Sequence, residues 1–417
     1  MMYKLGFLAS VLMFRLMLDI SYILVVSDIF SYHSYKFSFG IFQYLLSWLM
    51  LFLSFSIVST KLIKVSDFFF LMTYLGLIVP MSSIYGLDDN RDIFPLLLTI
   101  SSLYLINIIT KLKSAYEISY PTVRDGEKLA IYISLVFVFF LIGWYLISGV
   151  TFNLDIAKVY EFREDNTEAS TGGVFSYTNG WTYQIFNIFL ISITLLHRKY
   201  LFCLLFVLIQ IYFFSASAHK TVLFLPILVF GVWYYLKNTN KLIIIPFSFF
   251  LLILLANITY VISEDIMFSS LFSRRVFFVP ARLTFNYFDF FSENPYVYWS
   301  NSVLSWLIDY PYTENVSKTI GAYLGNESNA NNGFISSGYA HAGVFGVIVY
   351  SVFIGSILRF IDKYSSKNIP VWLGVSLTLV PLRNLILSSD FFTVLLTHGL
   401  LIALILIFLS GNKNIDN

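Results

Sequence analysis

The sequence predicts an all-α protein that crosses a membrane many times. Hydrophobic residues make up 58% of the 417 residues, charged residues only 12%, and the mean hydropathy is +0.77. This composition lies outside the range of water-soluble globular domains. Aromatic residues reach 19%, and aromatic rings are favoured where a membrane protein meets the headgroup layer. We therefore expect a polytopic membrane protein.

The apolar segments predict about twelve transmembrane helices in a single transmembrane domain that covers residues 1–417. A helix needs about 20 apolar residues to cross a hydrocarbon layer roughly 30 Å thick. Twelve runs approach or meet this length, and the run at 200–214 is the shortest. The runs are 5–26, 39–59, 67–86, 93–110, 129–149, 179–196, 200–214, 221–236, 242–262, 342–360, 369–388 and 391–410.

The basic residues predict the orientation of these helices. Lys and Arg are concentrated in short cytoplasmic segments of membrane proteins. If Lys4 is cytoplasmic, fifteen basic residues fall in the cytoplasmic segments and only six in the short outer loops. We expect both termini inside and two sizeable periplasmic loops, 151–180 and 263–341. No small-x-small cleavage site follows the first apolar run, so we interpret it as a retained span and not as a signal peptide.

Arg15 and Asp19 interrupt the first predicted span. Their spacing of four places both side chains on one helical face, where an unpaired ion in hydrocarbon costs several kcal/mol. We expect an ion pair, within this helix or with a neighbouring one. The pair is predicted to be a structural intramembrane contact, and the alternative is a part of a substrate path.

Two short outer segments carry candidate anion-binding residues. Arg163 lies among acidic residues in the first loop and is either a ligand-binding cation or a member of a solvated surface cluster. His219 and Lys220 follow a run of small residues, Ser-Ala-Ser-Ala at 215–218. Lys220 is either part of an anion site or a lysine that extends toward the headgroups.

The long loop 263–341 contains a predicted amphipathic helix that lies at the membrane interface. Pro280 suits the first turn of a helix. After it, Arg282, Asn286, Asp289 and Glu293 share one face, while phenylalanines occupy much of the rest.

Further residues of the same loop point to a phosphate-containing ligand. Arg274 and Arg275 precede the helix, and paired guanidinium groups match phosphate oxygens bidentately. Ordinary anionic lipid headgroups are the alternative ligand. Asn331 and Asn332 suit a turn first and contacts to sugar hydroxyls second. His341 ends the loop, where it is either structural or a general base.

Several function classes are disfavoured by missing motifs. The sequence has no Gly-x-x-x-x-Gly-Lys phosphate loop, no dinucleotide fingerprint and no paired-Cys or His-Glu-x-x-His metal motif. We expect no cofactor, no metal and no nucleic-acid partner. An outward-facing enzyme without a nucleotide site needs a substrate that is already activated, and a sugar diphosphate on a polyprenol carrier meets that need.

The sequence resembles the Wzy-type polymerases of O-antigen or oligosaccharide repeat units, which reside in the bacterial inner membrane. The resemblance spans most of the chain and lies in the overall layout and in four local stretches. These are RLMLDISY at 15–22, YEFRE at 160–164, RRVFFVP at 274–280 with Asn294-Pro295 beyond it, and SGYAHAG at 337–343.

The resemblance implies an integral-membrane glycosyltransferase of polysaccharide and lipopolysaccharide biosynthesis. Its substrate would be an oligosaccharide repeat linked to undecaprenyl pyrophosphate, polymerised at the periplasmic face. His341, or else Asp289 or Glu293, would accept the proton of the acceptor hydroxyl. The pyrophosphate would be bound by cationic side chains, for which the candidates are Arg163, Arg274, Arg275, Arg282 and Lys220.

Two other functions stay open at this point. An O-antigen ligase shares the donor, the topology and a large outer loop with an essential histidine. A flippase for lipid-linked oligosaccharides also has about twelve spans, but a carrier has little use for so long an outer loop. Membrane lipids, a chain-length regulator and a flippase are the partners to expect.

Overall fold

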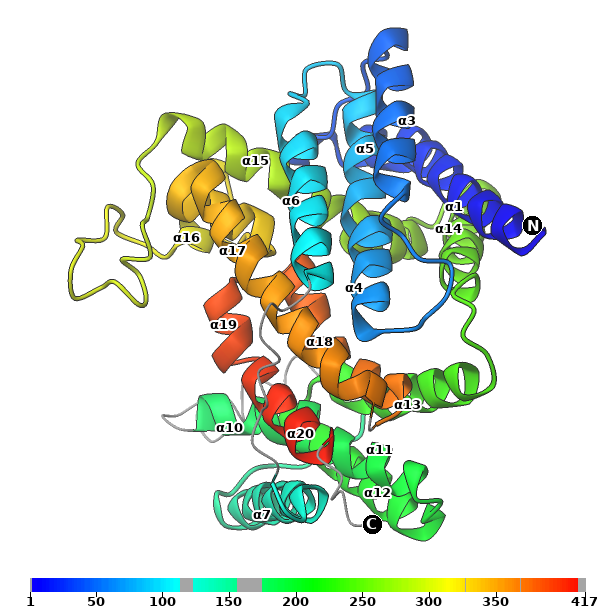
Figure 1. Cartoon of the computed structure of the whole chain (residues 1–417). Coiled ribbons are helices and arrows are strands. Elements are labelled where there is room, and N and C mark those ends of the chain that lie inside the picture. Colours follow the sequence, from blue (N-terminus) through cyan, green and yellow to red (C-terminus); the bar gives the residue numbers. More distant parts are fainter. Residues whose placement is uncertain (1, 113–122, 156–174, 327, 368, 412–417) are drawn as a thin grey trace.

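The computed structural model describes residues 2–112, 123–155, 175–326, 328–367 and 369–411 (Figure 1). Within these ranges every regular element is a helix, and only two isolated bridges, Ser38–Asp88 and Lys61–Lys241, join extended segments. The predicted all-α class is confirmed.

Eight helices in the described ranges are long and apolar enough to cross a membrane. Two of them contain short π-helical segments, which are single wide turns within a continuous helix. The eight are α1–η1–α2 (Met2–Ser21, Tyr22–Val26, Ser27–Ile29), α4–η3–α5 (Val65–Thr73, Tyr74–Ile78, Val79–Leu87), α6 (Phe94–Lys111), α7 (Gly126–Ile147), α12 (Tyr200–Ser217), α13 (Lys220–Asn238), α14 (Ile244–Ser263) and α17 (Phe334–Lys367).

The remaining predicted runs are also helical, although their helices are shorter or interrupted. All twelve apolar runs therefore coincide with helix, and the number that cross the bilayer stays a prediction. The shorter elements are α3 (Ile41–Phe55), α10–η4–α11 (Phe175–Trp181, Thr182–Phe186, Asn187–Leu196), α18 (Val371–Leu387), α19 (Phe391–Leu396) and α20 (Leu400–Gly411).

Loops that the distribution of basic residues assigns to the same side of a membrane contact one another. On the predicted outer side, Ser38 bonds to the backbone of Leu87, and the amide of Asn153 donates to the carbonyl of Ser215 at 2.9 Å. On the predicted inner side, the amide of Leu62 donates to the carbonyl of Asn240 at 2.7 Å. This pattern is the one expected when successive helices run in alternate directions between two polar layers.

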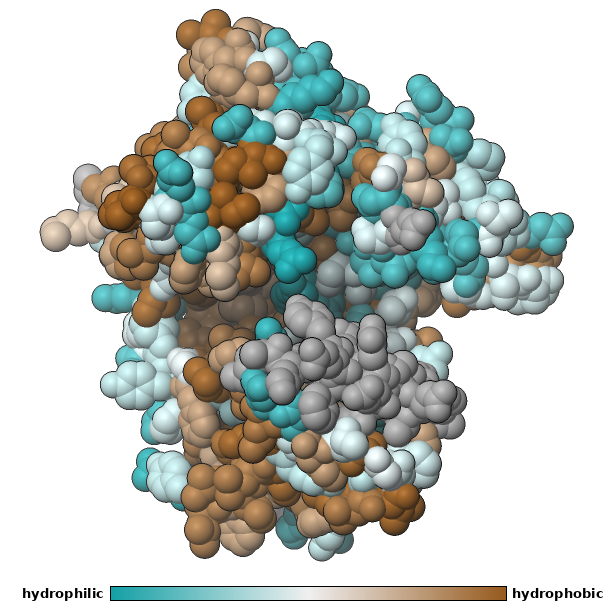
Figure 2. Space-filling view, turned by 180° about the vertical axis from the view of Figure 1, so that it is seen from behind, coloured by the Kyte–Doolittle hydropathy of each residue, from teal (hydrophilic) through white to brown (hydrophobic). Residues whose placement is uncertain are grey.

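The surface is too apolar for contact with water alone. Ile147, Leu201 and Ile262 are each 78–79% exposed, and exposed apolar areas of this extent indicate a lipid or protein partner. Figure 2 shows hydrophobic residues over the region of α7, α11 and α12 at the bottom, while hydrophilic residues gather at the upper right, where the segment after α15 lies. The structure thus supports a membrane-embedded bundle with a polar cap.

Arg15 and Asp19 form a buried ion pair within α1. Arg15 also donates to the hydroxyl oxygens of Ser82 at 3.2 Å and Ser83 at 3.0 Å, both on α5, and its guanidinium lies 5.2 Å from the Trp48 ring centroid. Because each donor has an acceptor, two charges are accommodated in an apolar layer. The contact holds α1, α3 and α5 together.

The long loop is largely ordered as helix. It contains η5 (Ser269–Phe278), α15 (Val279–Glu293) and α16 (Val316–Tyr323). The helix predicted after Pro280 is present, and its position at a membrane interface stays a prediction. Most of α15 is buried in the protein, Arg282 and Asn286 included, and α15 packs against α17 and α5.

The burial of α15 has a local cause. Arg91, from the turn after α5, lies against its polar stripe at 3.6 Å from an oxygen of Asp289 and 3.4 Å from an oxygen of Asn286. Arg282 and Asn286 therefore face protein, while Asp289 and Glu293 at the C-terminal end of the stripe are exposed. Burial raises the pKa of Asp289 and the charge of Arg91 opposes that rise, with the pKa remaining above its ordinary value.

Candidate functional site

A cavity of about 510 Å³ lies at the predicted outer ends of α17, α18 and α19. We call it the polar cavity, because most of the residues that line it have an amide, hydroxyl, imidazole or carboxylate side chain. Such groups hydrogen-bond to hydroxyl-rich ligands. The polar lining comprises Asn301, Asn315, Ser317, Asn331, Asn332, Ser337, His341, Asn384, Ser388, Ser389, Asp390, Thr393 and His398.

His341 is placed at the cavity by a break in α17. The backbone leaves helical geometry at Ala342 (φ −155°, ψ 35°) and Gly343 (φ 59°, ψ −139°). The second conformation is open only to glycine, and a Cβ at Gly343 would lie 2.8 Å from the hydroxyl oxygen of Tyr296. α17 thus begins at Phe334, before the predicted span, and His341 lies within its first segment and not at the end of a loop.

Both ring nitrogens of His341 are engaged. The backbone amide of Trp299 donates to Nδ1 at 3.1 Å, and Nε2 lies 3.3 Å from Oδ2 of Asp390. A nitrogen that accepts from an amide carries no proton, so the neutral ring holds its proton on Nε2 and donates it to Asp390. The imidazole is 3% exposed and stacks on the indole of Trp299, with centroids 5.1 Å apart.

Asp390 is the acidic group at the cavity. It caps α19, where Oδ1 accepts from the amide of Phe392 at 2.9 Å, and Oδ2 also accepts from the hydroxyl of Tyr350 at 2.7 Å. Burial raises the pKa of Asp390, but the hydrogen bonds from His341, Tyr350 and Phe392 outweigh burial, and the pKa lies below its ordinary value. The side chain is still 25% exposed, so an ionised carboxylate faces the cavity.

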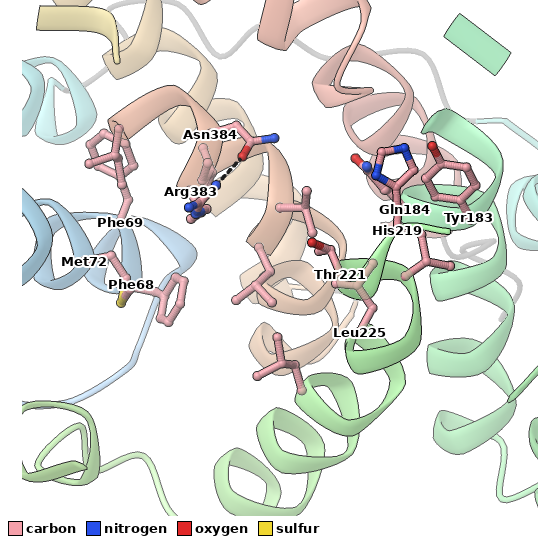
Figure 3. Close-up of a pocket in the computed structure, with 16 residues that line it drawn as sticks. Phe68, Phe69, Met72, Tyr183, Gln184, His219, Thr221, Leu225, Arg383 and Asn384 are labelled. Carbon is pink, nitrogen blue, oxygen red and sulfur yellow. Dashed lines mark hydrogen bonds between the residues drawn. The ribbon is translucent and has the colours of Figure 1, made fainter. Parts of the chain in front are cut away.

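A second cavity of about 510 Å³ adjoins the first, because Asn384 lines both. We call it the apolar cavity. Figure 3 shows Phe68, Phe69 and Met72 from α4 on one side and Leu225 from α13 on the other. Its shape and lining suit a hydrocarbon chain.

Arg383 is the charged residue of the apolar cavity. Its guanidinium donates to Oδ1 of Asn384 at 3.0 Å (Figure 3). Arg383 is exposed, and among the described residues it forms no ion pair. Its charge is therefore accessible to an anionic group of a ligand. Its neighbour Asn384 lines both cavities.

Two of the predicted phosphate-binding arginines, Arg274 and Arg282, form a separate group, which we call the outer arginine cluster. Arg274 lies 4.2 Å from the Phe30 ring centroid and Arg282 4.9 Å from that of Tyr35. Arg282 also donates to the carbonyl of His33. Arg275 is exposed nearby in the sequence, and Arg163 lies outside the described residues. Nε atoms of Arg274 and Arg282 are buried without a partner among the described residues.

The other predicted site residues lie away from the polar cavity. Asp289 contacts Arg91, as described above, and neither it nor the exposed Glu293 lines that cavity. Lys220 is exposed at the start of α13, next to His219, which lines the apolar cavity. Of the predicted proton acceptors, His341 alone reaches the polar cavity.

The sequence interpretation missed Asp390 and Arg383. Each is separated from His341 by more than 40 residues, so no local motif joins them. A signal did exist, since Arg383 is a charged residue inside the apolar run 369–388 and Asp390 directly precedes the run 391–410. Such residues mark functional positions in membrane proteins.

The described residues contain no group of three side chains suited to hold a metal ion. No family model, curated protein or solved structure matches this chain.

Proposed function

We propose that this protein is an integral-membrane glycosyltransferase that polymerises oligosaccharide repeats linked to undecaprenyl pyrophosphate, at the periplasmic face of a bacterial inner membrane. The observation that carries the proposal is the pair of adjoining cavities, one polar with His341 and Asp390 and one apolar with Arg383. The sequence resemblance supplies the choice of a polymerase.

The two cavities match the two halves of a lipid-linked sugar. Isoprenoid units would pack against Phe68, Met72 and Leu225, and the diphosphate would meet Arg383. The sugars would enter the polar cavity, where Oδ1 of Asn332 is a buried acceptor without a partner among the described residues. An acceptor in that state favours a ligand that donates hydroxyl protons.

Transfer requires a proton acceptor beside the incoming hydroxyl. The oxygen of that hydroxyl bonds to the anomeric carbon of the donor sugar, and its proton passes to the carboxylate of Asp390. The bond between this carbon and the diphosphate oxygen breaks, and the electron pair leaves with the lipid diphosphate. In this mechanism His341 is a positioning residue, since its Nε2 proton orients Asp390 and Trp299 occupies Nδ1.

Cationic groups would stabilise the leaving diphosphate. Negative charge grows on it as the bond breaks, and a preorganised guanidinium in a water-poor site is most effective there. Arg383 would have this role. The outer arginine cluster would hold the diphosphate of the second substrate, because a polymerase joins two lipid-linked molecules.

A deletion strain tests the class of reaction, with surface polysaccharide resolved by gel electrophoresis. Loss of a polymerase leaves a single repeat on the lipid core. Loss of a ligase leaves bare core with polymer retained on the carrier lipid, and loss of a flippase traps repeats inside the cell. The proposal requires the first pattern, restored by the intact gene, and either other pattern contradicts it.

A further inference from the structure

A third cavity, of about 500 Å³, lies at the opposite ends of the helices, which charge assigns to the cytoplasm. We call it the inner cavity. It forms where the ends of α11 and α13 meet the start of α18, and these three helices contact one another. Leu62 also lines it, and the amide of Leu62 donates a backbone hydrogen bond to the carbonyl of Asn240.

Two cations line the inner cavity, Arg198 and Lys237. Neither forms an ion pair among the described residues. The neighbouring acid Glu127 contacts His197 instead, at 2.6 Å. Arg198 has φ 57°, the left-handed geometry that ends a helix and that glycine or asparagine adopts more readily. An arginine in this position brings its charge to the cavity at a conformational cost.

Aromatic and aliphatic groups complete the wall. Trp233 and Trp372 line the cavity, and the ammonium of Lys237 lies 5.0 Å from the Trp233 ring centroid. Indole rings favour the headgroup layer of a bilayer. Leu195, Leu196 and Leu236 extend the lining toward hydrocarbon. Basic residues also complement the carbonyl ends of helices. That effect accounts for the two charges, but it does not account for a cavity lined by two indoles.

We infer that the inner cavity binds the headgroup of an anionic phospholipid from the inner leaflet. The phosphodiester would lie between Arg198 and Lys237, with the glycerol against the indoles and an acyl chain along the leucines. A phosphate bearing two chains fits a half-open cavity with polar and apolar walls better than a free anion does. This inference is independent of the proposed glycosyl transfer, because it involves other residues at the other end of the helices.

Native mass spectrometry of the purified full-length protein in neutral detergent tests the inference, with phosphatidylglycerol and phosphatidylcholine as probes. The parent protein is expected to retain phosphatidylglycerol in preference. The double variant Arg198→Gln/Lys237→Gln should weaken that retention about thirtyfold, given roughly 1 kcal/mol per cation near a charged lipid surface. The matched control Lys4→Gln/Lys128→Gln removes two exposed charges from the same predicted side, outside the cavity.

Two further measurements complete the test. Leu236→Trp fills the cavity without changing charge, and it should also lower retention of phosphatidylglycerol, so a result is obtained even if the double variant does not fold. Inorganic phosphate is added as a competitor to separate a lipid headgroup from a free anion. The inference would be overturned if the parent and the double variant retained phosphatidylglycerol equally, or if the control lost as much retention as the double variant. Binding of phosphatidylcholine equal to that of phosphatidylglycerol, or displacement of the lipid by equimolar phosphate, would also overturn it.

Discussion

The backbone amide of Trp299 donates a hydrogen bond to Nδ1 of His341 across 3.1 Å. This contact fixes the proton of the neutral imidazole on Nε2, directed at Asp390. His341 could gain a second proton only by losing the contact with Trp299. The geometry therefore favours Asp390 over His341 as the proton acceptor of the proposed reaction.

The pH dependence of activity distinguishes the two candidates. The folded pKa of Asp390 lies below the ordinary value of 3.8, so the carboxylate stays ionised as the pH falls through that value. Activity of the purified enzyme should thus be level from neutral pH down to about pH 5, well above the ordinary pKa of an aspartate. A decline in activity within this range would argue against Asp390 as the proton acceptor. Initial rates across this range, on protein shown to stay folded, decide between them.

Replacing Arg383 should weaken the use of the lipid-linked substrate and leave the fold intact. Arg383→Gln removes a charge-assisted contact to a diphosphate, a contact that contributes about 1.5–3 kcal/mol, or roughly ten- to a hundredfold in kcat/KM. The unfolding temperature in detergent should not fall, because within the described residues the guanidinium donates a single hydrogen bond, to the neighbouring Asn384. Arg359→Gln makes the same charge change at the other end of the bundle and should have no effect on rate.

The ion pair of Arg15 and Asp19 should be a stability element. Asp19→Asn leaves a buried guanidinium without its counter-charge, which costs about 3–5 kcal/mol. The double variant Arg15→Met/Asp19→Leu removes both charges and should recover much of this loss. Thermal unfolding in detergent measures both, with the exposed Asp28→Asn on the same helical stretch as control. Parent-like unfolding of Asp19→Asn would show that the contact does not hold the helices together.

Gly343 should be required for the position of His341. In Gly343→Ala the new methyl group approaches the hydroxyl of Tyr296, and the backbone adopts a conformation costing about 1–3 kcal/mol for a residue with a Cβ. We expect lower stability together with a loss of activity larger than the loss of folded protein. Gly231→Ala is the matched control, since nothing lies within 4 Å of its Cβ position. Equal behaviour of the two variants would refute this role.

Much of the helical architecture could be predicted from hydrophobic length alone, because the bilayer imposes one requirement on every span. The contact of Arg15 with Asp19 followed from helical spacing. The position of α15 did not, since Arg91, which neutralises its polar stripe, is 198 residues before Asp289 in the chain. Its phenylalanines were the local sign of burial on both faces.

Only part of the candidate site could be predicted from the sequence. His341 could be singled out as a polar residue at a membrane boundary. Its contact with Asp390 depends on how α17 packs against α18 and α19, and tertiary packing is not encoded in the spacing of either segment. Arg274 and Arg275 are adjacent in the sequence, and this pairing predicted a phosphate-binding site. Arg383 has no neighbouring arginine, so no pattern pointed to it.

Polymer formation by an Asp390→Asn variant tests the central claim most directly. The variant and the parent protein are expressed at equal levels in the deletion strain, and surface polysaccharide is resolved by gel electrophoresis. Loss of a general base lowers the rate about 10²–10⁴-fold, so the account predicts single repeats in place of a ladder, with Asp289→Asn retaining the ladder. A full-length ladder from Asp390→Asn would contradict the account.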